Sequence, residues 1–261
     1  EPICKGSCIF KTHTPAWSDT NILNLGRFIK SSVILGHIRA AASGHNPLEP
    51  VIVNFQNCHP FKYGRYTFMH NGGVPDFLRI KRDLCNMLSF ECYQDLSGST
   101  DSEHIFALFL SLLSSNDEQL SAVDIAATLD STFCKVIKLC EVHGITAACS
   151  LNVVITDGVH VVASRYRNCD SQPPSLYYNF GTHFCGHMGN FTSSDLLPCG
   201  GREVIITSGP LNKGGFGSPG CYQATPSNQW RLVPRNHMLI CSGNESDISV
   251  VKSYTLQPMS V

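Results

Sequence analysis

Residues 66–73 read YTFMHNGG, an apolar strand pattern that runs into a carboxamide and two glycines, and this stretch decides the fold. Asn-Gly is a strong hairpin signal, but a hairpin needs a second strand directly afterwards. The residues from Val74 to Ser89 instead carry apolar side chains at helical spacing. We therefore predict a strand over 66–70, a glycine corner and a helix from about Val74, with backbone N–H groups left free at the corner to bind an oxyanion.

The composition is that of a globular chain without an obvious macromolecular ligand. Its 261 residues are 43% hydrophobic, which is enough for a sizeable core, and we predict one domain over residues 1–261. The net charge of −1 and the lack of a Lys/Arg stripe argue against a nucleic-acid partner. The longest apolar run, Ile105–Leu113, is too short to cross a membrane and predicts a buried helix.

The cysteine content favours a reducing, cytoplasmic compartment. The 13 cysteines lack the paired spacing of a disulfide framework, so we expect free thiols. His183, Cys185 and His187 offer an alternative as zinc ligands, but their spacing is poor for zinc and no fourth ligand is evident. We predict neither a metal nor a cofactor.

The remaining pattern predicts helices in the first half of the chain and antiparallel strands in both halves, an α+β layered fold. Early strands are predicted at Cys8–Lys11 and Ser32–Ile38. Asp101 is expected to cap a helix over Ser102–Ser114. Further elements are predicted as a helix after Asp19, a helix from Ser121 to near Gly144, a hairpin of 151–156 with 159–164, and strands at 176–180, 203–208, 237–241 and 249–256.

Three polar groups follow apolar elements: Arg39, Asn71 with Gly72, and Asp101. Singly, each has an ordinary explanation as a surface charge, a turn or a helix cap. Together, a guanidinium suits a carboxylate, a carboxylate suits an ammonium, and a carboxamide beside a backbone N–H suits an oxyanion. A γ-glutamyl group presents all three features, as in glutamine or glutathione.

Four segments, in this order and at about this spacing, resemble class II glutamine amidotransferases: GHIRAAASG (36–44), NCHPF (57–61), FMHNGG (68–73) and STDSE (99–103). Four others are similar to the branch that includes the eukaryotic glutathione-degrading amidotransferase subunit and its bacterial relatives: TPAWSD (14–19), LNVVITDG (151–158), PPSLYY (173–178) and VPRNHML (233–239). The resemblance implies an N-terminal-nucleophile (Ntn) hydrolase with a four-layer αββα sandwich.

The same resemblance implies roles for the candidate residues. Arg39 would bind the substrate α-carboxylate and Asp101 its α-ammonium, while the Asn71 side chain and the Gly72 N–H would form the oxyanion hole. His59 is expected to be a structural support beneath the pocket rather than a base. The implied partners are a small γ-glutamyl substrate and peptidase-like subunits, in the cytoplasm.

The sequence differs from the family pattern at the position of the expected nucleophile. The family uses a cysteine at the mature N-terminus, whose α-amino group is the base, whereas residue 1 is Glu. Cys4 and Cys8 precede the TPAWSD segment too closely to replace it. We expect an N-terminally truncated sandwich that lacks its first strands and does not hydrolyse substrate as given. The alternative is a catalytically inactive homologue that binds γ-glutamyl ligands or serves as a subunit of a complex.

Overall fold

The computed structural model describes residues 7–39, 54–113, 120–181, 183–185, 190–192, 203–211, 230–242 and 252–255. The helices are η1 (Ala16–Ser18), α1 (Thr20–Phe28), α2 (Phe77–Cys85), α3 (Phe90–Gln94), α4 (Asp101–Leu112) and α5 (Ala122–Val142). The strands are β1 (Phe61–Tyr63), β2 (Tyr66–Gly73), β3 (Ser150–Thr156), β4 (His160–Arg165), β5 (Tyr177–Gly181), β6 (His183–Cys185), β7 (Asn190–Thr192), β8 (Glu203–Thr207), β9 (Arg231–Leu232), β10 (His237–Ser242) and β11 (Lys252–Thr255). The predicted α+β class is confirmed.

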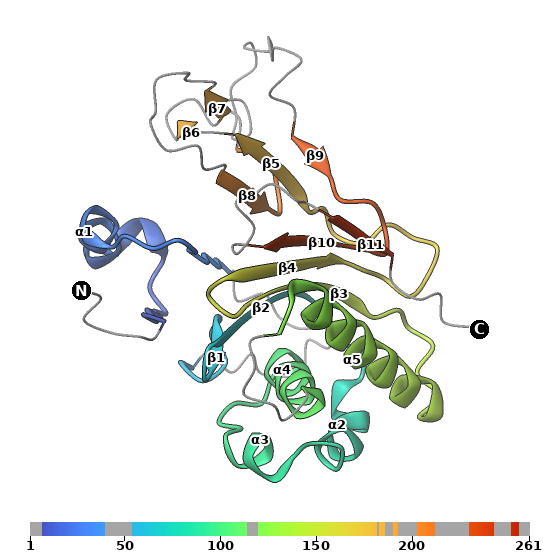
Figure 1. Cartoon of the computed structure of the whole chain (residues 1–261). Coiled ribbons are helices and arrows are strands. Elements are labelled where there is room, and N and C mark those ends of the chain that lie inside the picture. The colour runs from blue at the N-terminus through green and yellow to red at the C-terminus, as the bar shows by residue number, and fades with distance from the viewer. Residues whose placement is uncertain are drawn as a thin grey trace.

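A six-stranded antiparallel sheet in the order β1-β2-β3-β4-β10-β11 forms the centre of the molecule (Figure 1). Its β3–β4 hairpin was predicted from the Asp157-Gly158 turn. Gly158 has a φ of 92°, and the Asp157 carboxylate accepts hydrogen bonds from the backbone N–H groups of Val159 and His160. Glycine at positive φ and aspartate bonding ahead along the chain are the usual chemistry of such a turn.

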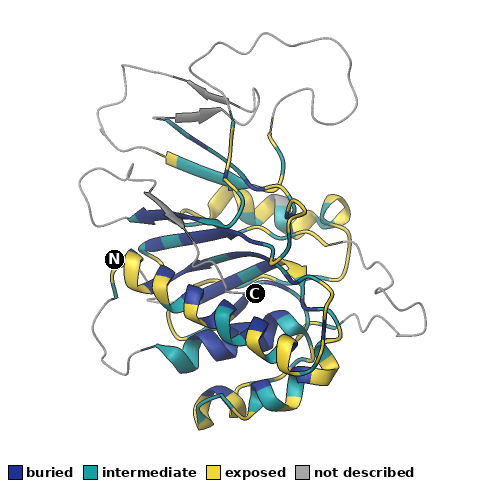
Figure 2. Cartoon of the chain, turned by 90° about the vertical axis from the view of Figure 1, so that its right-hand side faces the viewer, coloured by how far each residue is buried: buried dark blue, intermediate teal, exposed yellow. Residues whose placement is uncertain are grey.

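The two faces of this sheet bury two separate apolar cores, because alternate residues of a strand point to opposite faces. On β10, Met238 and Ile240 join the large core that α2, α4 and α5 cover, whereas Leu239 and Cys241 join a smaller core beneath the second sheet. Buried residues are accordingly concentrated in the central strands and on the helix faces that point toward them (Figure 2). The helices, the large sheet and the small sheet therefore form successive layers, in the order expected of an αββα sandwich.

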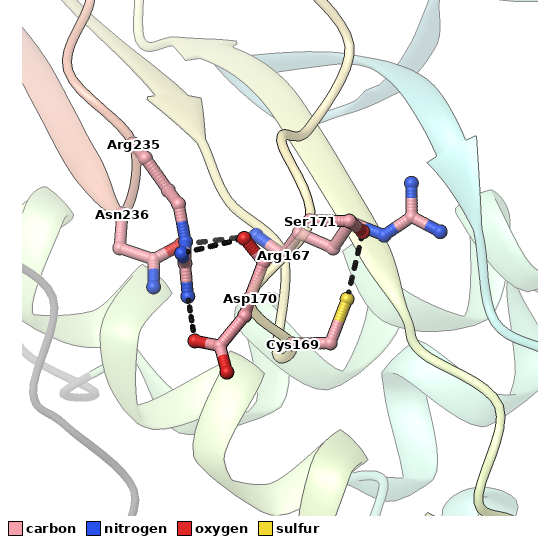
Figure 3. A network of polar contacts seen from close by, with 6 residues as sticks. All are labelled: Arg167, Cys169, Asp170, Ser171, Arg235 and Asn236. Carbon is pink, nitrogen blue, oxygen red and sulfur yellow. Dashed lines mark hydrogen bonds and ion pairs between the residues drawn. The ribbon is translucent and has the colours of Figure 1, made fainter.

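The small sheet, in the order β8-β5-β9, is fixed to the large one by a buried arginine. Arg165 at the end of β4 donates to the carbonyl oxygens of Pro173, Pro174 and Val233 and to the side chain of Gln172. A second group of polar contacts lies nearby at the surface (Figure 3): Arg235 donates to the carbonyl and carboxylate of Asp170, and the Arg167 N–H donates to Asn236 Oδ1. The contacts of Arg165 thus link the PPSLYY and VPRNHML segments.

The first 33 described residues form an arm that differs from the prediction. Neither Cys8–Lys11 nor Ser32–Ile38 is a strand, and Ile34 and Ile38 are 73% and 77% exposed. A strand persists only where a neighbour satisfies its backbone groups, and in the described part of the chain neither segment has a strand partner. On the side of β2 away from β3, β1 pairs only with Tyr66–Phe68, so no described strand pairs with residues 69–73 there.

The predicted bounds of β2 and of the helix after it also differ from the structure. β2 continues through Gly73 rather than ending at His70, and α2 begins only at Phe77, after Asp76 in the left-handed region at φ 47°. α2 ends at Cys85, before the predicted end at Ser89, and a separate short helix, α3, follows. α5 matches its prediction, with Ser121 as the N-cap of a capping box. Among the described residues, no helix is long and apolar enough to span a membrane.

Candidate functional site

A cavity of about 2380 Å³ lies between the N-terminal arm and the ends of β2 and α4. Arg39, Asn71, Gly72 and Asp101 all line it. They come from three separate parts of the chain, and the fold brings them to one concave surface. Arg39 and Asn71 are exposed and Asp101 is partly exposed, so their polar groups are accessible to a ligand.

The position of Asn71 follows from the alternation of β2. Phe68 and His70 point into the helix layer, where the Phe68 ring stacks on Phe106 and His70 bonds to Ser102 of α4. Asn71 is one residue further along, so its side chain lies on the other face of the strand. The stretch that opened the sequence analysis thus buries His70 and presents Asn71 to the cavity.

Gly72 is required by a close approach of β3. A Cβ atom at residue 72 would lie 1.9 Å from the carbonyl oxygen of Ser150 and 2.9 Å from His70 Nε2. No larger residue fits without moving the backbone. Gly72 therefore serves strand packing at this point, and the predicted corner begins only after Gly73.

Asp101 is the first residue of α4 and is not its cap, in contrast to the prediction. Thr100 caps the helix through a hydrogen bond from the Glu103 N–H. Asp101 Oδ2 accepts from the Val74 N–H at 2.8 Å, and Oδ1 accepts from the Ser102 N–H at 2.8 Å. A carboxylate has about four acceptor positions, so it retains capacity for an ammonium while its orientation is fixed.

Two residues of the quoted motifs hold the loop that precedes Asp101. Glu103 is buried and accepts from the N–H groups of Ser97 and Gly98 at 2.9 and 2.8 Å. Asn57 accepts from the Ser99 N–H at 2.9 Å and donates to Ser99 Oγ at 3.2 Å. These contacts join the NCHPF and STDSE segments. The sequence analysis did not single out either residue, although both lie inside those motifs.

Two stacked histidines lie at the base of the arm. The rings of His37 and His59 are 4.2 Å apart, and His59 also contacts Phe61 edge-on. Burial, together with the nearby His37, His70, Arg39 and Lys11, lowers the pKa of His59 to about 2. Burial likewise lowers the pKa of His37. His59 is thus a neutral, buried ring that contacts the segment leading to Arg39, which accords with the expected supporting role.

The described cysteines and the candidate metal ligands were compared with the sequence predictions. Nine of the described cysteines are free thiols, and two of them, Cys8 and Cys58, line the cavity. Within the described ranges, no group of three Cys, His, Asp or Glu side chains is arranged to hold a metal ion. Of the alternative zinc ligands, His187 lies outside the described residues.

The layered fold and this cavity define an α+β protein whose site combines a guanidinium, a carboxamide and a carboxylate. The sequence profile of the Glutamine amidotransferases class-II matches residues 5–176, and the chain belongs to this family.

One curated relative supports this assignment, and one solved structure has the same fold. The chain is 30% identical over 249 residues to a Saccharomyces cerevisiae protein named probable glutamine amidotransferase DUG3; the match covers 90% of the chain and 66% of that relative's length. A glutamine aminotransferase class-II domain protein from Silicibacter pomeroyi has the same fold, with a TM-score of 0.66 and 23% identity over 96% of this chain and 86% of that one. The predicted family and fold class are confirmed.

Proposed function

We propose that the cavity binds and hydrolyses γ-glutamyl amides, glutamine or glutathione, in glutathione catabolism. The Arg39 guanidinium binds the α-carboxylate, Asp101 binds the α-ammonium, and the Asn71 side chain with the Gly72 N–H stabilises the oxyanion. One observation carries this proposal: Asp101 is hydrogen-bonded to the residue directly after β2, so the ammonium-binding group and the oxyanion groups are fixed to each other.

The cavity is large enough for either substrate. Sites for small molecules usually measure about 300–1000 Å³, and this cavity measures about 2380 Å³. It extends along β2 to Arg65 and to the β3–β4 turn at Asp157. The cavity therefore has room for glutathione as well as for glutamine.

We further propose that the nucleophile is the N-terminal cysteine of the family, supplied by a segment upstream of residue 1. The cysteine's α-amino group would take the thiol proton, and the sulfur would attack the γ-carbonyl carbon. The amine would leave with that proton, and water would then hydrolyse the thioester to release glutamate and the free thiol. Residues 69–73 of β2 support this proposal, because their outer side has no described strand partner and lies beside the oxyanion groups. Peptidase-like partner subunits and a cytoplasmic location belong to the same proposal.

The test is an assay of the chain with and without an upstream segment that begins with cysteine. Ammonia release from glutamine and glutamate release from glutathione are measured. We expect no turnover by the chain as given and turnover by the extended chain. In the extended chain, Arg39→Ala should chiefly raise KM, and Asn71→Ala should lower kcat by about 10²–10³-fold, the usual effect of losing one oxyanion donor.

Two results would contradict the proposal. Turnover by the chain as given, abolished by Cys4→Ala or Cys8→Ala, would place the nucleophile within residues 1–261. An extended chain that binds glutathione but never releases glutamate would favour the inactive γ-glutamyl-binding homologue.

A further inference from the structure

His70 is a buried polar residue in β2 that the proposed reaction does not use. Its exposed fraction is 3%. Its Nδ1 lies 2.9 Å from Ser102 Oγ, and its Nε2 lies 3.0 Å from the carbonyl oxygen of Ser150. Both ring nitrogens are therefore hydrogen-bonded, one to the helix layer and one to the adjacent strand.

The chemistry of the partners fixes the direction of these bonds. A carbonyl oxygen only accepts, so Nε2 carries a proton and donates it to Ser150. In the neutral ring Nδ1 is then an acceptor, and it receives the Ser102 hydroxyl proton. Ser102 Oγ also lies 3.3 Å from Asp101 Oδ1, and the Ser102 N–H donates to the same oxygen at 2.8 Å. Ser102 thus contacts both His70 and the candidate ammonium-binding carboxylate.

These bonds close a ring around the oxyanion segment. His70 is joined to Ser102, Ser102 to Asp101, and Asp101 Oδ2 to the N–H of Val74. His70 and Val74 are the residues immediately before and after Asn71–Gly73. The first turn of α4 therefore holds β2 on both sides of its oxyanion groups. We call this ring of His70, Ser102, Asp101 and Val74 the brace.

We infer that His70 and Ser102 are positioning residues, which set the orientation of Asp101 relative to Asn71 and Gly72 through the brace. This inference rests on the proposed function for its ligand, a γ-glutamyl compound. Neither residue contacts the substrate. The brace fixes the separation between the ammonium site and the oxyanion site, which a ligand with both groups must match.

Ser102→Ala tests the brace with little change in volume, and Ser111→Ala is its matched control. Ser111 is also on α4, and its hydroxyl also makes two hydrogen bonds, to Ala107 O and from Ser89 N, outside the brace. Calorimetry measures binding of L-glutamine and of glutaramate, which keeps the carboxylate and amide but lacks the ammonium. Because the brace orients Asp101, only the ammonium-bearing ligand should respond.

Ser102→Ala keeps the Ser102 N–H bond to Asp101 and removes the neutral hydrogen bond between the Ser102 hydroxyl and His70. We expect it to raise the Kd for L-glutamine by about fivefold, the effect of roughly one neutral hydrogen bond, while the Kd for glutaramate stays unchanged. Ser102→Thr, which keeps the hydroxyl, should restore binding, and Ser111→Ala should change neither ligand. Equal weakening of both ligands by Ser102→Ala, or no weakening of either, would overturn the inference.

A second measurement judges the brace without any ligand. Hydrogen exchange of the Val74 amide reports its bond to Asp101 and should speed up by about tenfold or more in Ser102→Ala, but not in Ser111→Ala. Unchanged protection of Val74 would overturn the inference. If the parent chain binds no L-glutamine while Val74 exchange responds as expected, the proposed function fails and the brace stands.

Discussion

Gly72 and Ser150 lie so close together that a Cβ atom on residue 72 would be 1.9 Å from the Ser150 carbonyl oxygen. That oxygen cannot retreat easily, since His70 Nε2 donates to it. We expect Gly72→Ala to lower the free energy of unfolding by about 1–3 kcal/mol, as for other overpacked sites. Urea denaturation measures the effect.

Gly26→Ala is the control for this substitution. Gly26 lies within α1, and a Cβ there would meet nothing within 4 Å. Alanine is favoured over glycine in a helix by about 1 kcal/mol, so Gly26→Ala should be neutral or stabilising. A Gly72→Ala chain as stable as the Gly26→Ala chain would show that the close approach does not exist.

His59 should make the protein sensitive to acid. Its pKa in the folded protein is about 2, and in the unfolded chain it is about 6.5. Between these values the unfolded chain binds a proton that the folded chain does not, so stability falls as the pH falls below about 6.5. The slope from His59 alone is about 1.4 kcal/mol per pH unit.

His59→Phe keeps a stacked ring and removes this titration, so its unfolding free energy should fall less steeply between pH 6.5 and pH 4.5 than that of the parent. Phe61→Leu is the control, because Phe61 is buried against the same ring and does not titrate. It should lower stability at all pH values and leave the slope unchanged. Parallel pH profiles for the parent and His59→Phe would contradict the assignment.

Substitution of Arg165 and of Arg235 tests which arginine stabilises the junction of the two sheets. Arg165 is buried and donates to four oxygens, so Arg165→Met leaves buried acceptors unpaired and should cost about 3 kcal/mol. Arg235 bonds to the exposed Asp170 (Figure 3). Arg235→Met should therefore cost no more than about 1 kcal/mol. Thermal unfolding compares the two, and equal losses would contradict the role given to Arg165.

The elements that were predicted correctly are determined by residues close together in the sequence. Helix α5 begins with Ser121 and Asp124, which bond each other's backbone N–H groups as a capping box. The β3–β4 hairpin depends on the two-residue turn at Asp157 and Gly158. In both cases the residues that decide the structure are within a few positions of each other, so a single-sequence pattern suffices.

The errors occurred where structure depends on a distant partner. Ser32–Ile38 has a strand-like composition, but strand formation needs a neighbour that composition does not reveal. Asp101 was expected to cap its own helix, and its carboxylate instead binds the Val74 N–H, 27 residues away in sequence. The family resemblance indicated which site residues would converge. The contact between His70 and Ser102 links positions 32 residues apart, and no sequence pattern predicts it, so it was found only in the structure.

The most direct test of the central claim, that this cavity is a γ-glutamyl site, is calorimetric titration of the chain with L-glutamine and glutathione. Arg39→Ala and Asp101→Asn are compared with Arg82→Ala, a control on the exposed side of α2 that does not line the cavity. Each of the two site variants loses a charge-assisted contact worth about 1.5–3 kcal/mol. The account predicts saturable binding by the parent and by Arg82→Ala, and a Kd raised by at least about tenfold in both site variants. A parent chain that binds neither ligand, or site variants that bind as well as Arg82→Ala, would contradict it.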